Sequence, residues 1–586
     1  MQLKGLHRSK SALFLTIFLS AFSNVYSQKA VTATVRAVDN GEVIPYISVY
    51  YPAGRSGVVA DLQGRFSITT ASENDSLIFT AVGYRRLSLI AGKIGASIQL
   101  EQDAVQFREV VIRANADRYY FQCIDSCRKY SKIFKGAARA VFHQSSTVDT
   151  NCVEVMDAYY NASCNGYELE KLELKTGKFG LKPSGNSFFI FYENAKAITL
   201  LPSIQKPDYF PQQPLCLSVE QMLKKYIAEV IREYSNEKGD RMLQLKCIPR
   251  DKSGACFIAE YTLNRTKGYI TEVHLSGTTK KDHPFVPYTG DSIRSLTWNI
   301  HKSFVLENDT LCLRQVNFTY STTYLRLRPI HPQAELSAST TAILHLYNHR
   351  QPFLLPSFNF GKREPDDFHK INAYGYNEFF WNNRKEFHLA DQDQSLQFYR
   401  DPSVLRSPQV FMPEGIGRTG LYESPYIHWS RKRIRIRQAV SDTAQRYNPK
   451  LTDREQYELS VQLLAELDTI EGLHQLRTAV VIDPFHTYWH VPEDSLTGPF
   501  INIFFDQCEI KRRQLEEAYA GRTDAAVLKE LQAAYADWFR NFSETYYREV
   551  QRGHHIAAME KYAAEVERAL VIRNFHAEPS DHPEEE

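Results

Sequence analysis

The sequence predicts a multidomain α+β protein with an N-terminal β-sandwich, a central curved antiparallel sheet with a helix, and a C-terminal α-helical region. With 586 residues, the chain is too long for a single hydrophobic core. Up to about residue 350, short runs alternate apolar and polar residues between turn residues, a period of two that is typical of strands. Beyond Phe500, apolar residues recur every three or four positions, as they do in amphipathic helices.

Residues 1–27 have the pattern of a secretory signal peptide. A basic start precedes the apolar run 12–22, and Val25 and Ser27 stand at positions −3 and −1 of a cut before Gln28. This run is shorter than the roughly 20 residues that a spanning helix needs, and no later run reaches that length. We therefore expect an exported chain without a transmembrane helix, located in the periplasm, associated with the outer membrane, or secreted.

The charge balance argues against a nucleic-acid-binding protein, and the cysteine content limits the possible disulfides. The 70 basic and 68 acidic residues nearly balance, whereas a nucleic-acid-binding protein would show a basic domain or stripe. Nine cysteines in an exported chain could form disulfides, but the odd number leaves at least one thiol free or paired between chains. Cys247 and Cys256 flank a predicted turn, so they either form a disulfide or act as small buried side chains.

Residues 28–113 predict a small Greek-key β-sandwich of about seven strands. Asp39-Asn40-Gly41 forms a hairpin signal between two alternating runs. In "SGVVADLQGRFSI" (56–68), Gly64 supplies the positive φ that closes a second turn after Asp61.

The segments "NGEVIPYISVYYPAGRSGVVADLQGRFSI" (40–68), "LIFTAVGYRRL" (77–87) and "IQLEQDAVQFREVVI" (98–112) closely resemble the carboxypeptidase regulatory-like domain. This family is a prealbumin-like sandwich common at the N-termini of exported Bacteroidetes proteins. The resemblance covers about 85 residues and implies an accessory module for folding or docking, with no peptidase activity of its own.

Residues 114–350 predict a helix followed by an antiparallel sheet. The helix places Tyr120, Ile124, Cys127, Ser131 and Phe134 on one face. A second helix is predicted over 219–234, with a stripe formed by Met222, Tyr226, Val230 and Tyr234. A long sheet with a helix resembles the architecture of periplasmic lipoprotein carriers, which is an analogy of fold only.

Residues 351–445 predict loops rich in proline and aromatic residues, with a basic strand near their end. In "RKRIRIR" (431–437), Arg433, Arg435 and Arg437 would share one strand face. Two interpretations remain open: a patch for an anion, such as the phosphates of lipopolysaccharide, or for a partner, and a half-buried edge strand whose charges face solvent.

Residues 446–574 predict two strands and three helices, and 575–586 a disordered acidic tail. The passage near 480–520 resembles an uncharacterised bacterial domain whose helix carries His-Glu-Gln-x-His-Phe-Asp followed by Glu and Arg. Phe505-Asp506 and Glu509 match that motif, but Phe500 and Phe504 stand at its two histidine positions. Because two histidines on successive turns are what such a zinc site requires, the resemblance implies a metal-free relative.

No catalytic, cofactor-binding or metal-binding residue is predicted. The chain has no G-x-S-x-G elbow, phosphate-binding loop or His-Glu-x-x-His motif. His490 and Glu493 have the spacing of a zinc pair but lack a third ligand at the right distance, and His554 and His555 are expected to cap a helix. The segment 282–291 is read as capped turns, with a divalent-cation loop as the alternative.

These observations predict a non-catalytic exported cell-envelope protein with a binding or assembly role, whose partner is an envelope protein, a lipid or a glycan. The alternatives are a periplasmic carrier of lipid or glycan, and an envelope hydrolase whose site is built from residues far apart in the sequence.

Overall fold

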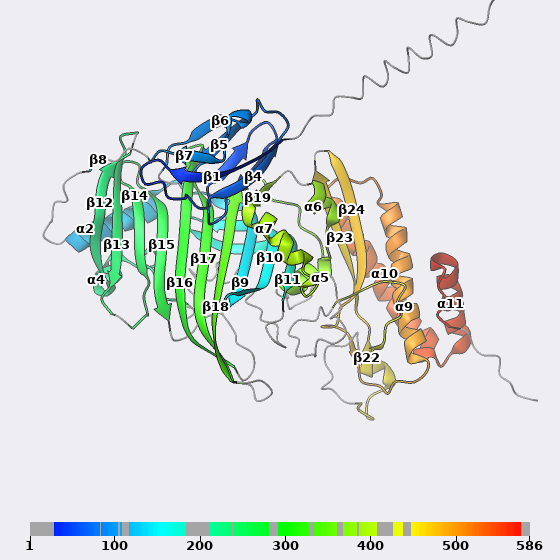
Figure 1. Ribbon diagram of the computed structural model, residues 1–586. Helices are drawn as coiled ribbons and strands as arrows, with labels where there is room; N and C mark the ends of the chain where they lie inside the picture. Colours follow the sequence, from blue (N-terminus) through cyan, green and yellow to red (C-terminus); the bar gives the residue numbers. More distant parts are fainter. Residues whose placement is uncertain are drawn as a thin grey trace, which may run out of the picture. The chain divides into compact units, whose positions relative to one another are not determined.

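The computed structural model describes residues 29–81, 84–102, 106–107, 116–182, 210–236, 238–251, 253–279, 291–327, 333–359, 367–383, 386–406, 426–436, 447–470 and 472–575. These residues form several β-sheets and a set of helices (Figure 1). They fall into two compact units, of which the first consists of residues up to 108 together with 234–241 and 385–394. The predicted α+β multidomain class is confirmed.

The first unit contains two sheets that share one core, as predicted for a β-sandwich. One sheet has the order β4 (Arg65–Thr70), β1 (Lys29–Ala37), β7 (Ser97–Leu100). The other has the order β19 (Phe387–Leu389), β3 (Ser56–Val59), β2 (Ser48–Tyr51), β5 (Ser76–Thr80), β6 (Leu87–Ile90). A short strand, β8 (Gln106–Phe107), pairs with residues 234–235, which belong to the same unit although they end strand β12 (Tyr226–Ser235) of the long sheet described below. Alternate residues of both sheets meet in the core, among them Val35, Phe66, Val49 and Phe79.

The turn between β3 and β4 has the predicted chemistry. Asp61 is fully buried, and its Oδ1 accepts hydrogen bonds from the backbone N–H groups of Gln63 (2.9 Å) and Arg65 (2.8 Å). Gly64 has φ +68°, and a Cβ at this position would lie 2.8 Å from the Val35 carbonyl oxygen. Glycine is therefore required both by the backbone conformation and by the available space.

Strand β19 was not predicted, because it comes from a segment almost 300 residues after the rest of the sandwich. It pairs in parallel with β3, and Phe387 stacks on Tyr50 with ring centroids 5.9 Å apart. A Cβ at Gly57 would lie 2.2 Å from the Phe387 ring, so this glycine makes room for the added strand. The sandwich thus extends beyond the predicted boundary of 28–113.

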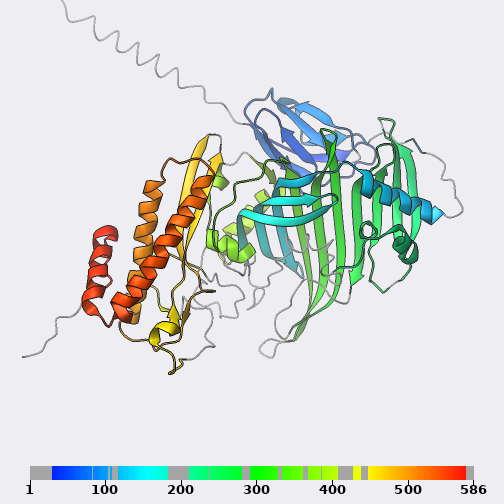
Figure 2. The same cartoon turned by 180° about the vertical axis from the view of Figure 1, so that it is seen from behind.

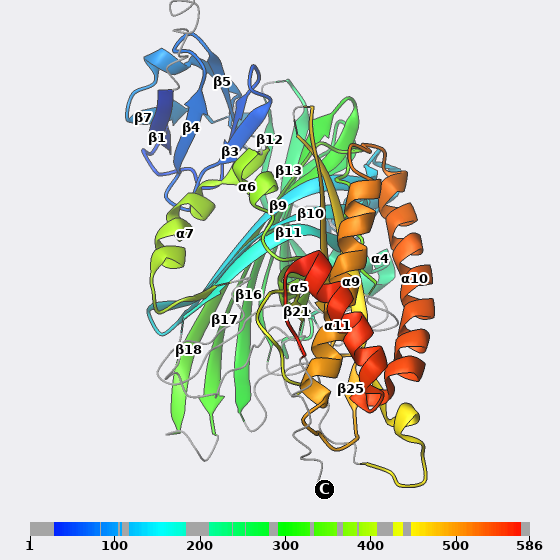
Figure 3. The ribbon, with the colours of Figure 1, turned by 90° about the vertical axis from the view of Figure 1, so that its right-hand side faces the viewer.

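The second unit is built on one long antiparallel sheet, which is strongly twisted (Figure 3). Its strands have the order β20-β11-β10-β9-β18-β17-β16-β15-β14-β13-β12. Their bounds are β9 (Lys135–Val148), β10 (Asn151–Asn165), β11 (Glu168–Leu181), β12 (Tyr226–Ser235), β13 (Arg241–Pro249), β14 (Ile258–Asn264), β15 (Tyr269–Thr279), β16 (Ser292–Glu307), β17 (Thr310–Arg326), β18 (Ala334–Tyr347) and β20 (Leu405–Arg406).

One face of this sheet is apolar and packs against helix α2 (Ala116–Tyr130), the 3-10 turn η2 (Pro214–Cys216) and helix α4 (Val219–Lys225) (Figure 2). The predicted face of α2 is confirmed for Tyr120, Ile124 and Cys127, which are buried. The helix ends at Tyr130, so the predicted positions 131 and 134 lie beyond it.

The predicted helix over 219–234 is wrong in its second half. A capping box of Ser218 and Gln221 starts α4, but the helix stops at Lys225 and the chain continues as strand β12. Residues 226–231 alternate between more and less exposed positions, the period of a strand. The spacing of residues 222, 226, 230 and 234 fits one face of a helix. Residues 226, 230 and 234 also fit one face of a strand, because they are an even number of positions apart. Pairing with the sheet selects the strand.

The C-terminal part of the second unit contains the two predicted strands and the three predicted helices. Strands β23 (Val461–Ile470) and β24 (Leu473–Ile482) form a hairpin, against which α9 (Thr497–Ala518) and α10 (Ala526–Val550) pack (Figure 1). Helix α11 (Ile556–Leu570) shares the same core. Smaller elements precede these strands: α5 (Asp367–Tyr374), α6 (Glu378–Asn383), α7 (Ala390–Arg400), β21 (Ile427–His428), η3 (Asp453–Gln456) and β22 (Tyr457–Glu458). Residues 390–394 of α7 belong to the first unit. Strand β25 (Tyr488–Trp489) follows β24.

Two predictions about the whole chain can be compared with the described residues. No helix in the described ranges is long and apolar enough to cross a membrane. All nine cysteines are free thiols, so the disulfide between Cys247 and Cys256 is not formed. Cys247 is completely buried, which agrees with the alternative that these thiols act as small core side chains.

Candidate functional site

The polar face of the central sheet carries a hollow of about 330 Å³, which we call the sheet pocket. Its lining residues come from the four neighbouring strands β13, β14, β15 and β16: Gln244, Glu260, Thr262, Glu272, His274 and His301. Strand pairing brings them together, because Thr262 lies opposite both Gln244 and Glu272. In the adjacent row, His274 lies opposite His301. Side chains directly opposite each other in antiparallel strands are close enough to interact.

Glu272 lies at the centre of the contacts in this pocket. Its Oε2 accepts a hydrogen bond from the Thr262 hydroxyl (2.9 Å), and its Oε1 lies 3.8 Å from His301 Nε2. Burial would raise the pKa of the Glu272 carboxyl, yet His301, Thr262 and the positive charge of Arg232 together hold this pKa below its ordinary value. Glu272 is therefore a carboxylate at neutral pH.

Each acidic side chain of the pocket has a basic neighbour. Lys246 Nζ lies 2.9 Å from Glu260 Oε1, and this ion pair raises the pKa of Lys246. Arg232, whose charge acts on Glu272, donates a hydrogen bond from Nε to Gln244 Oε1 (2.8 Å). The charges of these four groups cancel, and one further carboxylate, Glu229, acts on Lys246. The pocket therefore has no strong positive charge and at most a small negative one.

The pKa of Glu272 does not suit it to act as a general acid. A carboxyl group that serves as a general acid needs a raised pKa, and Glu272 has a lowered one. The pocket instead offers hydroxyl, amide, imidazole and carboxylate groups, which donate and accept hydrogen bonds over a short distance.

A second hollow of about 420 Å³ lies between α10 and β23. Most of its lining side chains are polar, including Arg454, Glu458, Gln462, Gln532 and Arg540. Polar side chains thus make up most of the lining residues of both hollows.

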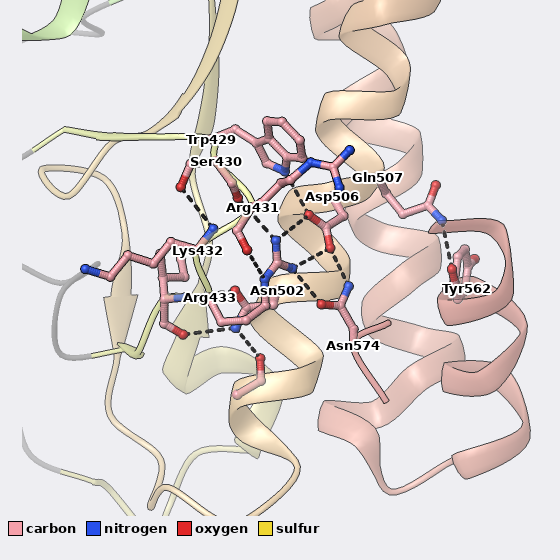
Figure 4. A network of polar contacts seen from close by, with 12 residues as sticks. Trp429, Ser430, Arg431, Lys432, Arg433, Asn502, Asp506, Gln507, Tyr562 and Asn574 are labelled. Atoms are coloured by element: carbon pink, nitrogen blue, oxygen red, sulfur yellow. Dashed lines mark hydrogen bonds and ion pairs between the residues drawn. The ribbon is translucent and has the colours of Figure 1, made fainter. Parts of the chain in front are cut away.

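The predicted anion patch does not take the expected form. Arg431–Arg435 are not in a strand, so the alternation that would place Arg433 and Arg435 on one face is absent. Arg437 lies outside the described residues. Arg433 Nη1 is 2.7 Å from Asp506 Oδ2 and 2.6 Å from Asn574 Oδ1 (Figure 4). The charge of Arg433 is thus matched by an internal carboxylate.

Asp506, on α9, is the centre of a hydrogen-bonded network that joins this helix to residues 429–434, and we call it the Asp506 network (Figure 4). Its carboxylate is 1% exposed and also accepts hydrogen bonds from Trp429 Nε1 (2.8 Å) and from the Asn574 amide. One turn earlier, Asn502 pairs with the backbone N–H and C=O of Ile434, both at 2.9 Å. These bonds fix residues 429–434 along the helix and explain why no strand forms there.

The positions where the similar bacterial domain has histidines are part of an aromatic core. Phe504 stacks on Tyr547 with ring centroids 5.4 Å apart and planes inclined by 6°. Phe500 lies against Tyr546, with centroids 5.1 Å apart. Farther along α9, Glu509 pairs with Arg512 and Arg513, both at 2.7 Å. This helix face packs the interior and offers no ligand set of the kind that the motif carries.

Three of the remaining residues singled out in the sequence have partners within the chain. His490 stacks on Tyr488 with centroids 5.4 Å apart. His555 occupies the N-cap position of α11 but makes no side-chain cap, and its Nδ1 instead lies 2.8 Å from the Glu549 carbonyl oxygen. Of the segment 282–291, only Asp291 is described, and it accepts a hydrogen bond from the Tyr324 hydroxyl (2.9 Å).

Comparisons with known proteins give no family for this chain: no family model matches it, and no curated protein is significantly similar. Among solved structures, it is similar to MucB, with 9% identity and a TM-score of 0.15 over 40% of this chain and 94% of that one. The MucA/MucB complex of Pseudomonas aeruginosa gives 8% identity and 0.14, over 40% and 94%. A Bacteroides fragilis protein of unknown function gives 7% and 0.11, over 55% and 98%. Such TM-scores establish neither a shared fold nor a function.

Proposed function

We propose that this chain is an exported, non-catalytic binding protein of the bacterial cell envelope, and that the sheet pocket holds a neutral, hydroxyl-rich ligand of the glycan class. The observation that carries this proposal is the pocket itself, in which two carboxylates, each with a basic neighbour, lie among amide, hydroxyl and imidazole groups. Sugar hydroxyls both donate and accept hydrogen bonds, so they match such a lining.

Export is supported by the signal-peptide pattern of residues 1–27, and the accessory role of the first unit by its resemblance to the carboxypeptidase regulatory-like domain. Expression of the full chain and of a variant lacking residues 1–27 in a Gram-negative host, followed by separation of cytoplasm, periplasm and membranes, tests export. The full chain should leave the cytoplasm and the truncated chain should remain there. Recovery of both in the cytoplasm would contradict the export claim.

Ligand binding is tested by titrating the purified chain with neutral oligosaccharides of different linkages, such as malto-, cello-, xylo- and chitohexaose, in a calorimeter. We expect one of them to bind, and the double variant Glu272→Gln/His301→Ala to bind it at least about tenfold more weakly, since the imidazole and the carboxylate charge that strengthens hydrogen bonds are both lost. Glu335→Gln, an exposed change on β18, is the matched control. Equal affinity of the double variant, or no binding to any of the four sugars, would overturn the proposal.

A further inference from the structure

Three metal-ligating side chains meet at one end of the central sheet, at the hairpin that joins β16 and β17. Glu307 ends β16, Cys312 lies near the start of β17, and His349 follows β18. One carboxylate oxygen, the thiol sulfur and one ring nitrogen of this group, which we call the hairpin cluster, all lie within 4.8 Å of one another. The strands that carry them lie side by side in the sheet (Figure 1).

Backbone geometry fixes all three positions. Asn308 and Asp309 have φ of 47° and 59°, so they form a tight hairpin turn that sets Glu307 opposite Thr310. Cys312 is then placed two residues along β17. On the other side, Asn348 and Arg350 have φ of 46° and 75° and bracket His349. The cluster is therefore held by two turns and does not depend on flexible side chains alone.

His349 faces a hydrogen-bond acceptor with each ring nitrogen. Its Nε2 lies 3.1 Å from the Leu313 carbonyl oxygen, and its Nδ1 lies 3.1 Å from Glu307 Oε2. A neutral imidazole carries one N–H, so it can donate to only one of these two acceptors. In a neutral ring, the other nitrogen therefore faces its acceptor with a lone pair, and a cation between those two atoms would satisfy both.

We propose that Glu307, Cys312 and His349 bind a divalent transition-metal ion of the zinc class. Carboxylate oxygen, thiolate sulfur and imidazole nitrogen are the three ligand types that zinc takes in proteins. Metal–ligand bonds of about 2.0–2.3 Å in a tetrahedron require ligand atoms about 3.3–3.5 Å apart. The observed separation of 3.1 Å between Oε2 and Nδ1 is close to this requirement.

The groups around the cluster act as supports of the kind that metal sites use. In the metal-bound form, Nε2–H of His349 would donate to the Leu313 carbonyl, 3.1 Å away, and Nδ1 would be the ligand atom. Arg314 Nη2 donates to the other Glu307 oxygen, Oε1 (2.7 Å), and orients the carboxylate. The Phe134 ring meets His349 edge to face, with centroids 5.0 Å apart, and limits rotation of the imidazole.

Two arginine side chains lie near the cluster, and metal binding raises the net charge of the cluster by only one unit. Arg314 contacts Glu307, and Arg350 lies over the Phe134 ring at 5.9 Å. A divalent ion that binds the neutral His349 ring through Nδ1 and the Cys312 thiolate displaces one proton, from the sulfur. Two positive charges enter and one leaves, so the net charge of the cluster rises by one.

Cobalt(II) titration of the purified full chain tests the site, since a thiolate ligand gives a strong sulfur-to-cobalt absorption band in the near ultraviolet. We expect one cobalt per chain, the thiolate band, and its loss when zinc is added. Cys312→Ser should abolish the band and weaken zinc binding at least about tenfold, as should His349→Gln. Cys508→Ser, a change of a buried thiol in the separate core around α9, should leave both unchanged.

The spectrum of the unchanged chain is decisive even if a variant fails to fold. No cobalt binding, binding without a thiolate band, or a band that survives Cys312→Ser would each overturn the proposal. The cluster lies six residues beyond His301 along β16, about 20 Å away, so the glycan titrations test a different site.

Discussion

The Asp506 network and the sheet pocket use the same kinds of side chain in opposite ways. Asp506 is 1% exposed and receives hydrogen bonds from Trp429, Arg433 and Asn574. The Glu272 side chain is 29% exposed, has one hydrogen bond of 2.9 Å and lies 3.8 Å from His301. The Asp506 carboxylate has its hydrogen-bonding capacity satisfied within the chain, so its role is structural. The Glu272 carboxylate is partly exposed and can still accept hydrogen bonds from a ligand.

The largest effect should come from the aromatic core beside the Asp506 network. Phe504→Ala removes a completely buried ring and should lower the free energy of unfolding by about 3–5 kcal/mol, measured by urea denaturation. Tyr130→Ala, at a position 82% exposed, should change it by less than about 0.5 kcal/mol. A small effect at Phe504 would mean that this helix face is not a packed core.

Removal of the Asp506 carboxylate should have the next largest effect. Asp506→Ala removes the buried acceptor shared by Trp429, Arg433 and Asn574 and should cost about 3 kcal/mol in urea denaturation. Asp537→Ala removes an acid from an exposed pair with Arg540, 3.5 Å apart, and should cost less than about 1 kcal/mol. Equal losses of unfolding free energy for the two substitutions would contradict the expectation that a buried carboxylate contributes more than an exposed one.

The sheet pocket should show a smaller, pH-dependent effect. The pKa of Glu272 is lower in the folded chain than in the unfolded one, so its ionised form stabilises the fold above about pH 4.3, and this contribution disappears as the pH falls through the folded-state pKa. Glu272→Gln should therefore cost about 1 kcal/mol at pH 7 and progressively less in acid. A cost that is independent of pH would show that the carboxylate charge contributes nothing.

Local pattern predicted the elements of this fold wherever one periodicity was dominant. The core of the sandwich, the buried face of α2 and the three C-terminal helices followed directly from it. The segment 226–234 satisfied two periods at once, and only pairing with the sheet made it a strand. Strand β19 was missed because nothing near residue 387 indicates a partner so far away in the sequence.

The two candidate sites were missed for a related reason. The sheet pocket collects residues from 244 to 301 on four strands, and their proximity depends on register, which hairpin geometry sets. A usable signal was present, since Glu260, Glu272 and His274 are ionisable residues on the outward-facing positions of adjacent strands. The hairpin cluster has no sequence spacing that marks a metal site, and for this reason the sequence predicted none.

Hydrogen–deuterium exchange of the full chain, with and without a saturating neutral oligosaccharide, tests the central claim most directly. The account predicts slower exchange in β13 to β16 around Glu272 and unchanged exchange in α9 around Asp506. Protection confined to α9, α10 and α11, with none in β13 to β16, would contradict it.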